Sequence, residues 1–201
     1  MGHCLSSQSR VYVDEESRIP QSETMDQSMR SVASVALFGS VDYHKVLVDM
    51  LSCENLIIDL CCGKRVYTPI VFNTMDIQSC PEMLVVARDI KPVSKIKHGQ
   101  AARWGKKDCC DVSTIYFALH ECSRTDRARV IANAMRIARK GVIVVGVAST
   151  FKPENTMLMG DPFLLDYLAT IDGDMRDLGF RRIVIYKDRV SSWHLQFSSS
   201  S

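Results

Sequence analysis

The sequence lacks the features of a membrane-spanning, secreted or nucleic-acid-binding protein. It has no uninterrupted apolar run of about 18 residues, so it predicts no transmembrane helix. Its first residues, MGHCLSSQSR, contain no apolar segment of the kind found in a secretory signal. The 25 Lys and Arg are nearly balanced by 23 Asp and Glu, so no excess charge argues for a nucleic-acid partner. We therefore expect a cytoplasmic protein that binds no nucleic acid.

Metal-binding and disulfide patterns are missing as well, although the chain contains eight cysteines. Cys61 is adjacent to Cys62 and Cys109 to Cys110, whereas zinc ligands are usually separated by two or more residues. A chain of this length without a signal segment favours reduced thiols, which behave as small apolar side chains when buried. We predict no metal site and no disulfide framework.

Apolar residues are scarce over residues 1–36, which are polar and Ser-rich. Such a segment buries too little apolar surface to fold, so we predict a disordered arm there and a second short tail at 198–201. The whole chain is 46% hydrophobic. The intervening residues, 37–197, are therefore expected to form one domain with a sizeable core.

The chain does contain an alternation of apolar runs and helical patterns. Four short runs without polar alternation suit parallel strands covered on both faces, at 55–60, 71–77, 111–117 and 141–147. Two alternating segments at 180–188 and 190–197 indicate an antiparallel hairpin. With helical patterns between the runs, the order predicts an α/β fold with a doubly wound, mostly parallel sheet.

The predicted helices carry recognisable end signals. One begins near Pro81, and another begins at Ser123, which resembles a capping box together with Asp126. We expect Gly141 to end that second helix and Gly179 to end a third, over 162–179. The last turn of the second helix is expected to be basic, with Arg136, Arg139 and Lys140.

The carboxyl ends of the parallel strands are the expected place for a ligand, near the point where the strand order reverses. The first loop there contains Cys61, Cys62 and Gly63, whose small side chains let the backbone approach a ligand closely. Asp76 ends the next strand, where an acid can accept two hydrogen bonds from a ribose diol.

Three segments resemble the motifs of one known family. IIDLCCGKR is similar to LDLGCGTG, and MDIQSCPEMLVVAR is similar to GVDISPEMLEVAR. DVSTIYFALHE, followed by RVIANAMRIARKGVIVVGV, is similar to an FALHH segment and an RVLKPGGxLxxV run. These are motifs of the class I S-adenosylmethionine-dependent methyltransferases, in that family's order, and they extend over about residues 41–197. The resemblance implies a Rossmann-like sheet of seven strands, the last two forming the antiparallel hairpin, and S-adenosylmethionine as the cofactor.

The resemblance also implies which residues contact the cofactor. Asp59, Cys61 and Gly63 would lie along its methionine part, and Asp76 would hold the ribose hydroxyls. The alternatives are that Asp59 is an ordinary acid at a strand end and that Asp76 caps the following helix.

Four further residues would surround the adenine and the reactive methyl. Ile77 would pack on the adenine, Ala101 would line it, and Phe117 would flank the methyl. Gln100 takes the place of an acid that reaches the adenine amino group in the family, and its amide oxygen can accept the same hydrogen bond.

The first motif departs from the family pattern. Arg65 replaces its last glycine, and only 13 positions separate Gly63 from Asp76, which leaves little room for a helix and a strand. A catalytically inactive, methyltransferase-like binding protein is therefore the alternative function. A nicotinamide-dependent oxidoreductase is disfavoured because the G-x-G-x-x-G fingerprint is absent.

Methyl transfer needs alignment of an acceptor rather than a fixed catalytic triad. His120, Glu121 and Tyr116 are weak candidates for a catalytic residue, and a loop position without a catalytic role is the simpler interpretation of His120. The apolar residues expected around the acceptor favour a small organic molecule, with membership of the core as the alternative; they are Tyr43, Met157, Met159 and Phe163.

The amino terminus fits the N-myristoylation pattern M-G-x-x-x-[ST], with Gly2 as the acceptor and Ser6 at the last position. Cys4 is a candidate for palmitoylation. Association with a membrane surface is thus an alternative to a purely cytoplasmic location, and an unmodified arm is the simpler interpretation.

Overall fold

The computed structural model describes residues 51, 54, 56–61, 74–78, 95–186 and 188–198. The predicted arm at 1–36 and the helix predicted from Pro81 lie outside these residues, as do Gly2, Cys4, Gly63 and Arg65. Strands and helices alternate along the described chain, which confirms the predicted α/β class.

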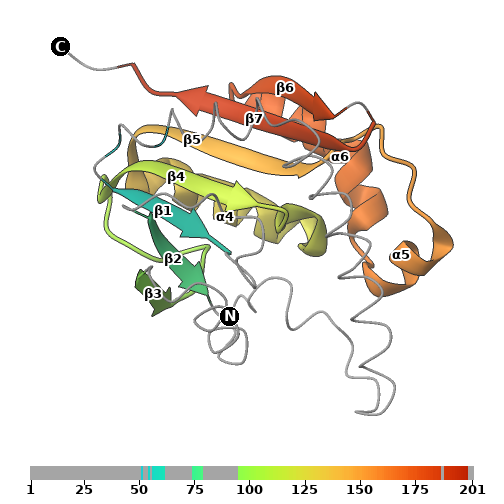
Figure 1. The fold of residues 1–201 in the computed structure, drawn as a ribbon, viewed down its shortest axis with the longest axis horizontal. Helices are drawn as coiled ribbons and strands as arrows, with labels where there is room; N and C mark the ends of the chain where they lie inside the picture. The colour runs from blue at the N-terminus through green and yellow to red at the C-terminus, as the bar shows by residue number, and fades with distance from the viewer. Residues whose placement is uncertain are drawn as a thin grey trace.

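The described strands form one mixed sheet in the order β3-β2-β1-β4-β5-β7-β6 (Figure 1). Strands β1 to β5 pair in parallel, and β7 runs antiparallel to both β5 and β6. Every residue of β1 and β4 is buried, as expected for strands covered on both faces. The strands are β1 (Ile57–Leu60), β2 (Thr74–Gln78), β3 (Lys95–His98), β4 (Cys110–Tyr116), β5 (Ala138–Val147), β6 (Arg181–Tyr186) and β7 (Val190–Gln196).

Helices α4 and α6 lie on the same face of the sheet, behind it in Figure 1. The Ser113 hydroxyl of β4 donates a hydrogen bond to a carbonyl of α4, and the Trp193 indole of β7 donates to Asp172 of α6. The strand register puts Ser113 and Trp193 on one side of the sheet, so the two helices cover that side together. The helical elements are η1 (Leu119–Glu121), α4 (Arg124–Ile137), α5 (Asn155–Gly160) and α6 (Leu164–Asp177).

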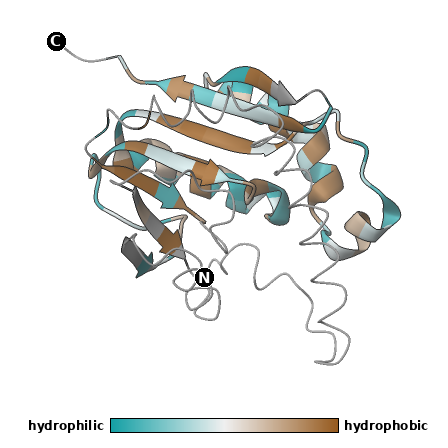
Figure 2. Cartoon of the chain, in the orientation of Figure 1, coloured by the Kyte–Doolittle hydropathy of each residue, from teal (hydrophilic) through white to brown (hydrophobic). Residues whose placement is uncertain are grey.

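The core lies between the central strands and these two helices. Figure 2 shows apolar residues concentrated along β5 and on the sides of the helices that face the sheet. Trp193, Tyr167 and Ile115 are among its largest side chains and are each at most 1% exposed.

The predicted ends of two helices are confirmed. The Ser123 hydroxyl accepts a hydrogen bond from the Asp126 amide and caps the first turn of α4. After α6, the Gly179 amide donates to Arg176 and the Phe180 amide donates to Met175, while Gly179 has a φ of 85°. This pair of bonds is a Schellman motif, which needs the left-handed conformation that glycine adopts without strain.

The predicted end of α4 at Gly141 is wrong. The helix ends at Ile137, and β5 begins directly at Ala138, so Arg139 and Lys140 belong to the strand. Their side chains form ion pairs with Asp111 and with Glu54 instead of lying along a helix terminus. Gly141 is needed inside the sheet, because a Cβ atom there would collide with the backbone carbonyl of β7.

Candidate functional site

The carboxyl ends of β1 and β4 meet where the order of the sheet reverses. Strands β2 and β3 lie on one side of β1, whereas β4 and β5 lie on the other. Open α/β sheets bind ligands in the crevice at such a switch point. The residues that directly follow β1 and β4 therefore define the candidate site, at the edge singled out from the sequence.

The two residues that follow these strands both have a left-handed backbone, although neither is glycine. The φ angle is 61° at Cys61 and 48° at Phe117. This conformation costs an L-residue about 1–2 kcal/mol, and such strain gathers at ligand sites. Since the motif LDLGCGTG has glycine at the position of Cys61, the chain keeps a turn that glycine would form without strain.

Asp59 lies in β1 with its side chain fully buried. The register places it level with Asp76 on β2 and with Thr114 on β4. The Thr114 hydroxyl donates a hydrogen bond to Asp59 Oδ1 over 3.4 Å. The sheet thus brings the backbone positions of the two predicted acids side by side; the side chain of Asp76 lies outside the description.

The residues predicted around the adenine lie on β2 and on the segment after β3. Ile77 is only 1% exposed and belongs to the core, where it pairs with Leu60 of β1. Gln100 is half-buried, and its carbonyl accepts hydrogen bonds from the amides of Arg103 and Trp104. The β3–β4 loop therefore starts with a tight turn at the edge of the sheet.

Asn133 of α4 holds this loop in place, a role that was not predicted from the sequence. Its Nδ2 donates to the carbonyl of the buried Ala101 over 2.6 Å and to that of Trp104 over 3.0 Å. Its Oδ1 accepts from Arg136 Nη2 at 2.6 Å. An amide at a buried position of a helix was the available signal, because a buried polar side chain normally has hydrogen-bond partners.

The segment after β4 carries Phe117 and the three weak catalytic candidates. The Phe117 amide donates to the Val145 carbonyl over 2.8 Å, which ties this turn to β5. Tyr116 and Phe117 are almost fully buried, and Glu121 is half-buried. The structure therefore places Tyr116 and Glu121 at the predicted edge without showing a catalytic role for either.

His120 lies in η1 and is 1% exposed. Its Nε2 is 3.6 Å from Oδ2 of Asp161, a buried acid in the loop between α5 and α6. Its ring also meets the Tyr167 ring edge to face, with centroids 6.0 Å apart. The imidazole thus connects the segment after β4 to α6.

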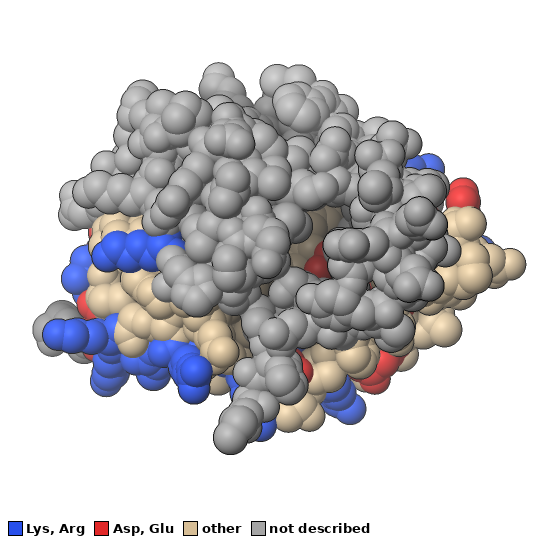
Figure 3. Space-filling model, turned by 90° about the horizontal axis from the view of Figure 1, so that it is seen from below, with Lys and Arg blue, Asp and Glu red and all other residues tan. Residues whose placement is uncertain are grey.

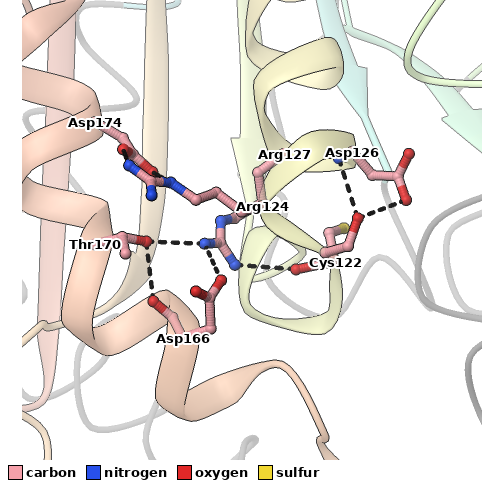
Figure 4. A network of polar contacts seen from close by, with 8 residues as sticks. Cys122, Arg124, Asp126, Arg127, Asp166, Thr170 and Asp174 are labelled. Carbon is pink, nitrogen blue, oxygen red and sulfur yellow. Dashed lines mark hydrogen bonds and ion pairs between the residues drawn. The ribbon is translucent and has the colours of Figure 1, made fainter.

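A second buried group, Arg127, joins α4 to α6 and was also missed (Figure 4). Its guanidinium donates to the carbonyl of Cys122 over 3.0 Å, to Asp166 over 2.7 Å and to Thr170 over 2.9 Å. It also lies 5.6 Å from the centroid of the Tyr167 ring, within the range of a cation–π contact. Because Cys122 directly follows η1, this network fixes the end of the segment that carries Phe117 and His120.

None of the described cysteines, Cys61, Cys109, Cys110 and Cys122, forms a disulfide. Burial, followed by the neighbouring Cys109, raises the pKa of the Cys110 thiol to about 12, and Cys110 Sγ donates to the Ile137 carbonyl. Among the described residues, no three His, Cys, Asp or Glu side chains gather as metal ligands. Within the same residues, no helix is both long enough and apolar enough to cross a bilayer.

No protein-family model and no curated protein matches the sequence. Solved structures, however, match the fold. An S-adenosylmethionine-dependent methyltransferase from Aquifex aeolicus is 15% identical, with a TM-score of 0.59, over 82% of this chain and 92% of that one. A methyltransferase from Thermotoga maritima is 16% identical, with a TM-score of 0.58, over 80% of this chain and 89% of that one.

A third similar structure is the magnesium protoporphyrin IX methyltransferase of Synechocystis with bound S-adenosylmethionine. It is 14% identical, with a TM-score of 0.54, over 94% of this chain and 85% of that one. At these identities the likeness is one of fold. The chain has the fold of the class I S-adenosylmethionine-dependent methyltransferases.

Proposed function

We propose that the protein is an S-adenosylmethionine-dependent methyltransferase that transfers a methyl group in line to a small organic acceptor. The main support is the register of Asp59 with Asp76 beside the left-handed turn at Cys61. These features lie at the switch point of a sheet with a methyltransferase fold. The proposal extends to the cofactor-binding residues expected from the sequence, Asp59, Cys61, Gly63, Asp76, Ile77, Gln100, Ala101 and Phe117.

The described residues fit such a cofactor in hydrogen-bonding groups and in shape. The buried Asp59 places carboxyl oxygens close to the turn at Cys61, where they can accept hydrogen bonds from a ligand amino group. The left-handed backbone at Cys61 is the conformation of a close-approach loop, which exposes amide groups to a ligand. When bound, the cofactor would supply a methyl group already activated by its positively charged sulfur.

The remaining task of the chain is to align the acceptor and to exclude water. Phe117 and Ala118 present buried apolar surface directly after β4, at the edge where the methyl group would lie. On α5, which follows β5 at the same end of the sheet, Met159 is 79% exposed and Phe163 just beyond is half-buried. Met157 is 4% exposed and belongs to the core, which is the alternative that the sequence left open for it.

For an acceptor that loses a proton, His120 is the weak candidate that has an acid beside it. The Asp161 carboxylate at 3.6 Å would stabilise the imidazolium that forms when the ring takes up a proton. His120→Gln should then lower kcat and remove an ionisation from its pH profile, with little change in KM. An unchanged pH profile would assign His120 a purely structural role.

Binding of the cofactor is tested by isothermal titration with S-adenosylmethionine and S-adenosylhomocysteine. Asp76→Ala should weaken binding by about 1.5–3 kcal/mol, or roughly 10- to 150-fold, because hydrogen bonds to a charged acceptor are strong. Asp177→Ala is the matched control, since it removes an exposed carboxylate at the end of α6. Equal affinities for wild type and Asp76→Ala would refute the assigned role of Asp76.

A chemical test uses the thiol of Cys61, which is half-buried and not part of a disulfide. Bound cofactor should slow its alkylation by N-ethylmaleimide, whereas the rate at Cys109, another half-buried thiol, should not change. Peptide mass spectrometry distinguishes the two sites. Equal alkylation of Cys61 with and without saturating cofactor would place the ligand elsewhere.

A further inference from the structure

The chain is nearly neutral, but its charges are unevenly distributed. Residues 95–140 contain eleven Lys or Arg and four Asp or Glu, a formal charge of +7. The rest of the chain contains 14 basic and 19 acidic residues, a formal charge of −5. The excess of positive charge therefore lies in β3, the β3–β4 loop, helix α4 and the start of β5.

Side-chain contacts bring five exposed cations of this region together. Arg136 of α4 donates to the carbonyls of Trp104 and Gly105 in the β3–β4 loop, at 3.1 and 2.8 Å. Arg139 of β5 donates to the Asp108 carbonyl of the same loop at 3.4 Å. We name this group the basic edge; it consists of Arg103, Lys106, Lys107, Arg136 and Arg139.

The basic edge is only partly neutralised. Arg139 is paired with the buried Asp111, and Lys107 lies 3.8 Å from Asp108. Among the described residues, no carboxylate lies within ion-pair distance of Arg103 or Lys106. In Figure 3 the largest group of visible Lys and Arg lies at the end of the molecule where β4 and β5 begin.

This end is opposite to the candidate site. The site lies at the carboxyl ends of the parallel strands, whereas four of the five cations, Lys106, Lys107, Arg136 and Arg139, lie near the starts of β4 and β5 and the last turn of α4. Neither a cofactor nor an acceptor bound at the switch point would use these cations. Their exposed side chains can bind a second, anionic partner while the site stays accessible.

We propose that the basic edge docks the protein on an anionic phospholipid bilayer, together with an acyl chain on Gly2. A single myristoyl chain binds membranes only marginally, so stable attachment needs a second signal such as a basic patch. Each Lys or Arg close to an anionic surface strengthens binding by about fivefold. The sequence pattern at Gly2 and the basic edge supply the two signals.

The edge is less suited to nucleic acid. Binding of single strands without sequence preference uses aromatic side chains on which bases stack. Trp104 is the aromatic residue of the β3–β4 loop, and its ring packs over Gly99 so closely that a Cβ atom there would collide with it. The ring therefore packs within the loop, and Trp104 is half-buried rather than exposed as a stacking platform.

The test is vesicle sedimentation with the full chain, myristoylated by a co-expressed N-myristoyltransferase. Vesicles of phosphatidylcholine alone are compared with vesicles that also contain phosphatidylserine. The edge variant carries Arg103→Gln, Lys106→Gln and Lys107→Gln. The control variant carries Arg176→Gln, Arg181→Gln and Arg189→Gln, which removes the same charge from exposed positions elsewhere.

On the anionic vesicles, the edge variant should partition about 100-fold more weakly than wild type, and the control variant should behave like wild type. Both variants should equal wild type on neutral vesicles, and Gly2→Ala should weaken binding to both kinds. Matching thermal midpoints would show that the variants are folded. The proposal is overturned if the edge variant binds anionic vesicles as tightly as wild type does, or if the control variant loses as much affinity as the edge variant. It is also overturned if wild type shows no preference for vesicles with phosphatidylserine, or if Gly2→Ala leaves vesicle binding unchanged. None of these measurements depends on methyl transfer.

Discussion

Replacing Asp166 with alanine should destabilise the protein more than replacing Arg127 with methionine, although Arg127 is the buried partner. The Arg127 side chain is 2% exposed, whereas that of Asp166 is 49% exposed. Asp166→Ala leaves a buried guanidinium without its counter-charge. Arg127→Met leaves a carboxylate that can be solvated by water, and the methionine fills most of the space of the arginine stem.

The magnitudes follow from what each change leaves behind. Breaking a buried ion pair by removing one partner costs about 3–5 kcal/mol, and the partial exposure of Asp166 favours the lower value, about 3 kcal/mol. Arg127→Met mainly leaves the Cys122 carbonyl without its donor, which costs about 1–2 kcal/mol. In a domain of this size, 1 kcal/mol corresponds to about 2–4 °C in Tm.

Urea unfolding followed by the fluorescence of the buried Trp193 measures both changes. The double variant, Arg127→Met with Asp166→Ala, should be more stable than Asp166→Ala alone, because it no longer contains the unpaired charge. Asp174→Ala is the control on the same helix, since its partner Arg124 is exposed and returns to water. A double variant less stable than Asp166→Ala, or Arg127→Met as the more damaging single change, would refute the argument.

Three further predictions concern single positions. Cys61→Gly should leave the free energy of unfolding unchanged or raise it by up to about 1 kcal/mol, because relief of the left-handed strain offsets the added entropy of the unfolded chain. Cys61→Val should lower the free energy of unfolding in the same urea titration. Burial, followed by Arg181, lowers the pKa of His194 to about 4, so the unfolded state binds the proton first and stability should fall by about 1–2 kcal/mol between pH 6.5 and pH 4. His194→Gln should remove this part of the pH dependence. If the free energy of unfolding of the variant falls with pH as steeply as that of wild type, the prediction is wrong. Asn133→Leu leaves the Ala101 carbonyl without its side-chain donor, so it should lower stability by about 2 kcal/mol and weaken cofactor binding in the titration.

The features that were predictable from the sequence are those set by nearby residues. Ser123 and Asp126 form their cap within three residues, and Gly179 ends α6 through bonds to the preceding turn. Four of the five parallel strands in the described sheet were predicted from apolar runs, because burial on both faces requires continuous apolar character. Strand β3 (Lys95–His98) was missed, since two lysines and a histidine leave it without such a run. The location of the site at the carboxyl ends of the strands then followed from the general rule for open α/β sheets. At that end the strand register places Asp59 beside Asp76.

The features that were missed depend on residues far apart in the chain. Arg127 is explained only by Asp166 and Thr170, 39 and 43 residues later. Likewise, Arg139 and Lys140 suit a helix terminus as well as a strand until their partners, 28 and 86 residues away, are known. The left-handed backbone at Cys61 could have been inferred from the glycine in the family motif, but that at Phe117 has no such signal.

The β3–β4 loop connects the two ends of the molecule to which we assign different roles. It begins with Gln100 at the carboxyl end of β3 and reaches the amino end of β4 at Cys110, so one segment carries a predicted adenine contact and three cations of the basic edge. Asn133 fixes its first half through the Ala101 and Trp104 carbonyls. Lys106 and Lys107 lie on the other half, and Arg103, between the two anchored carbonyls, has an exposed side chain. Their replacement by glutamine therefore removes charge without removing these two bonds. The edge variant should therefore keep the cofactor affinity of wild type, and loss of vesicle binding would be independent of the proposed methyl transfer.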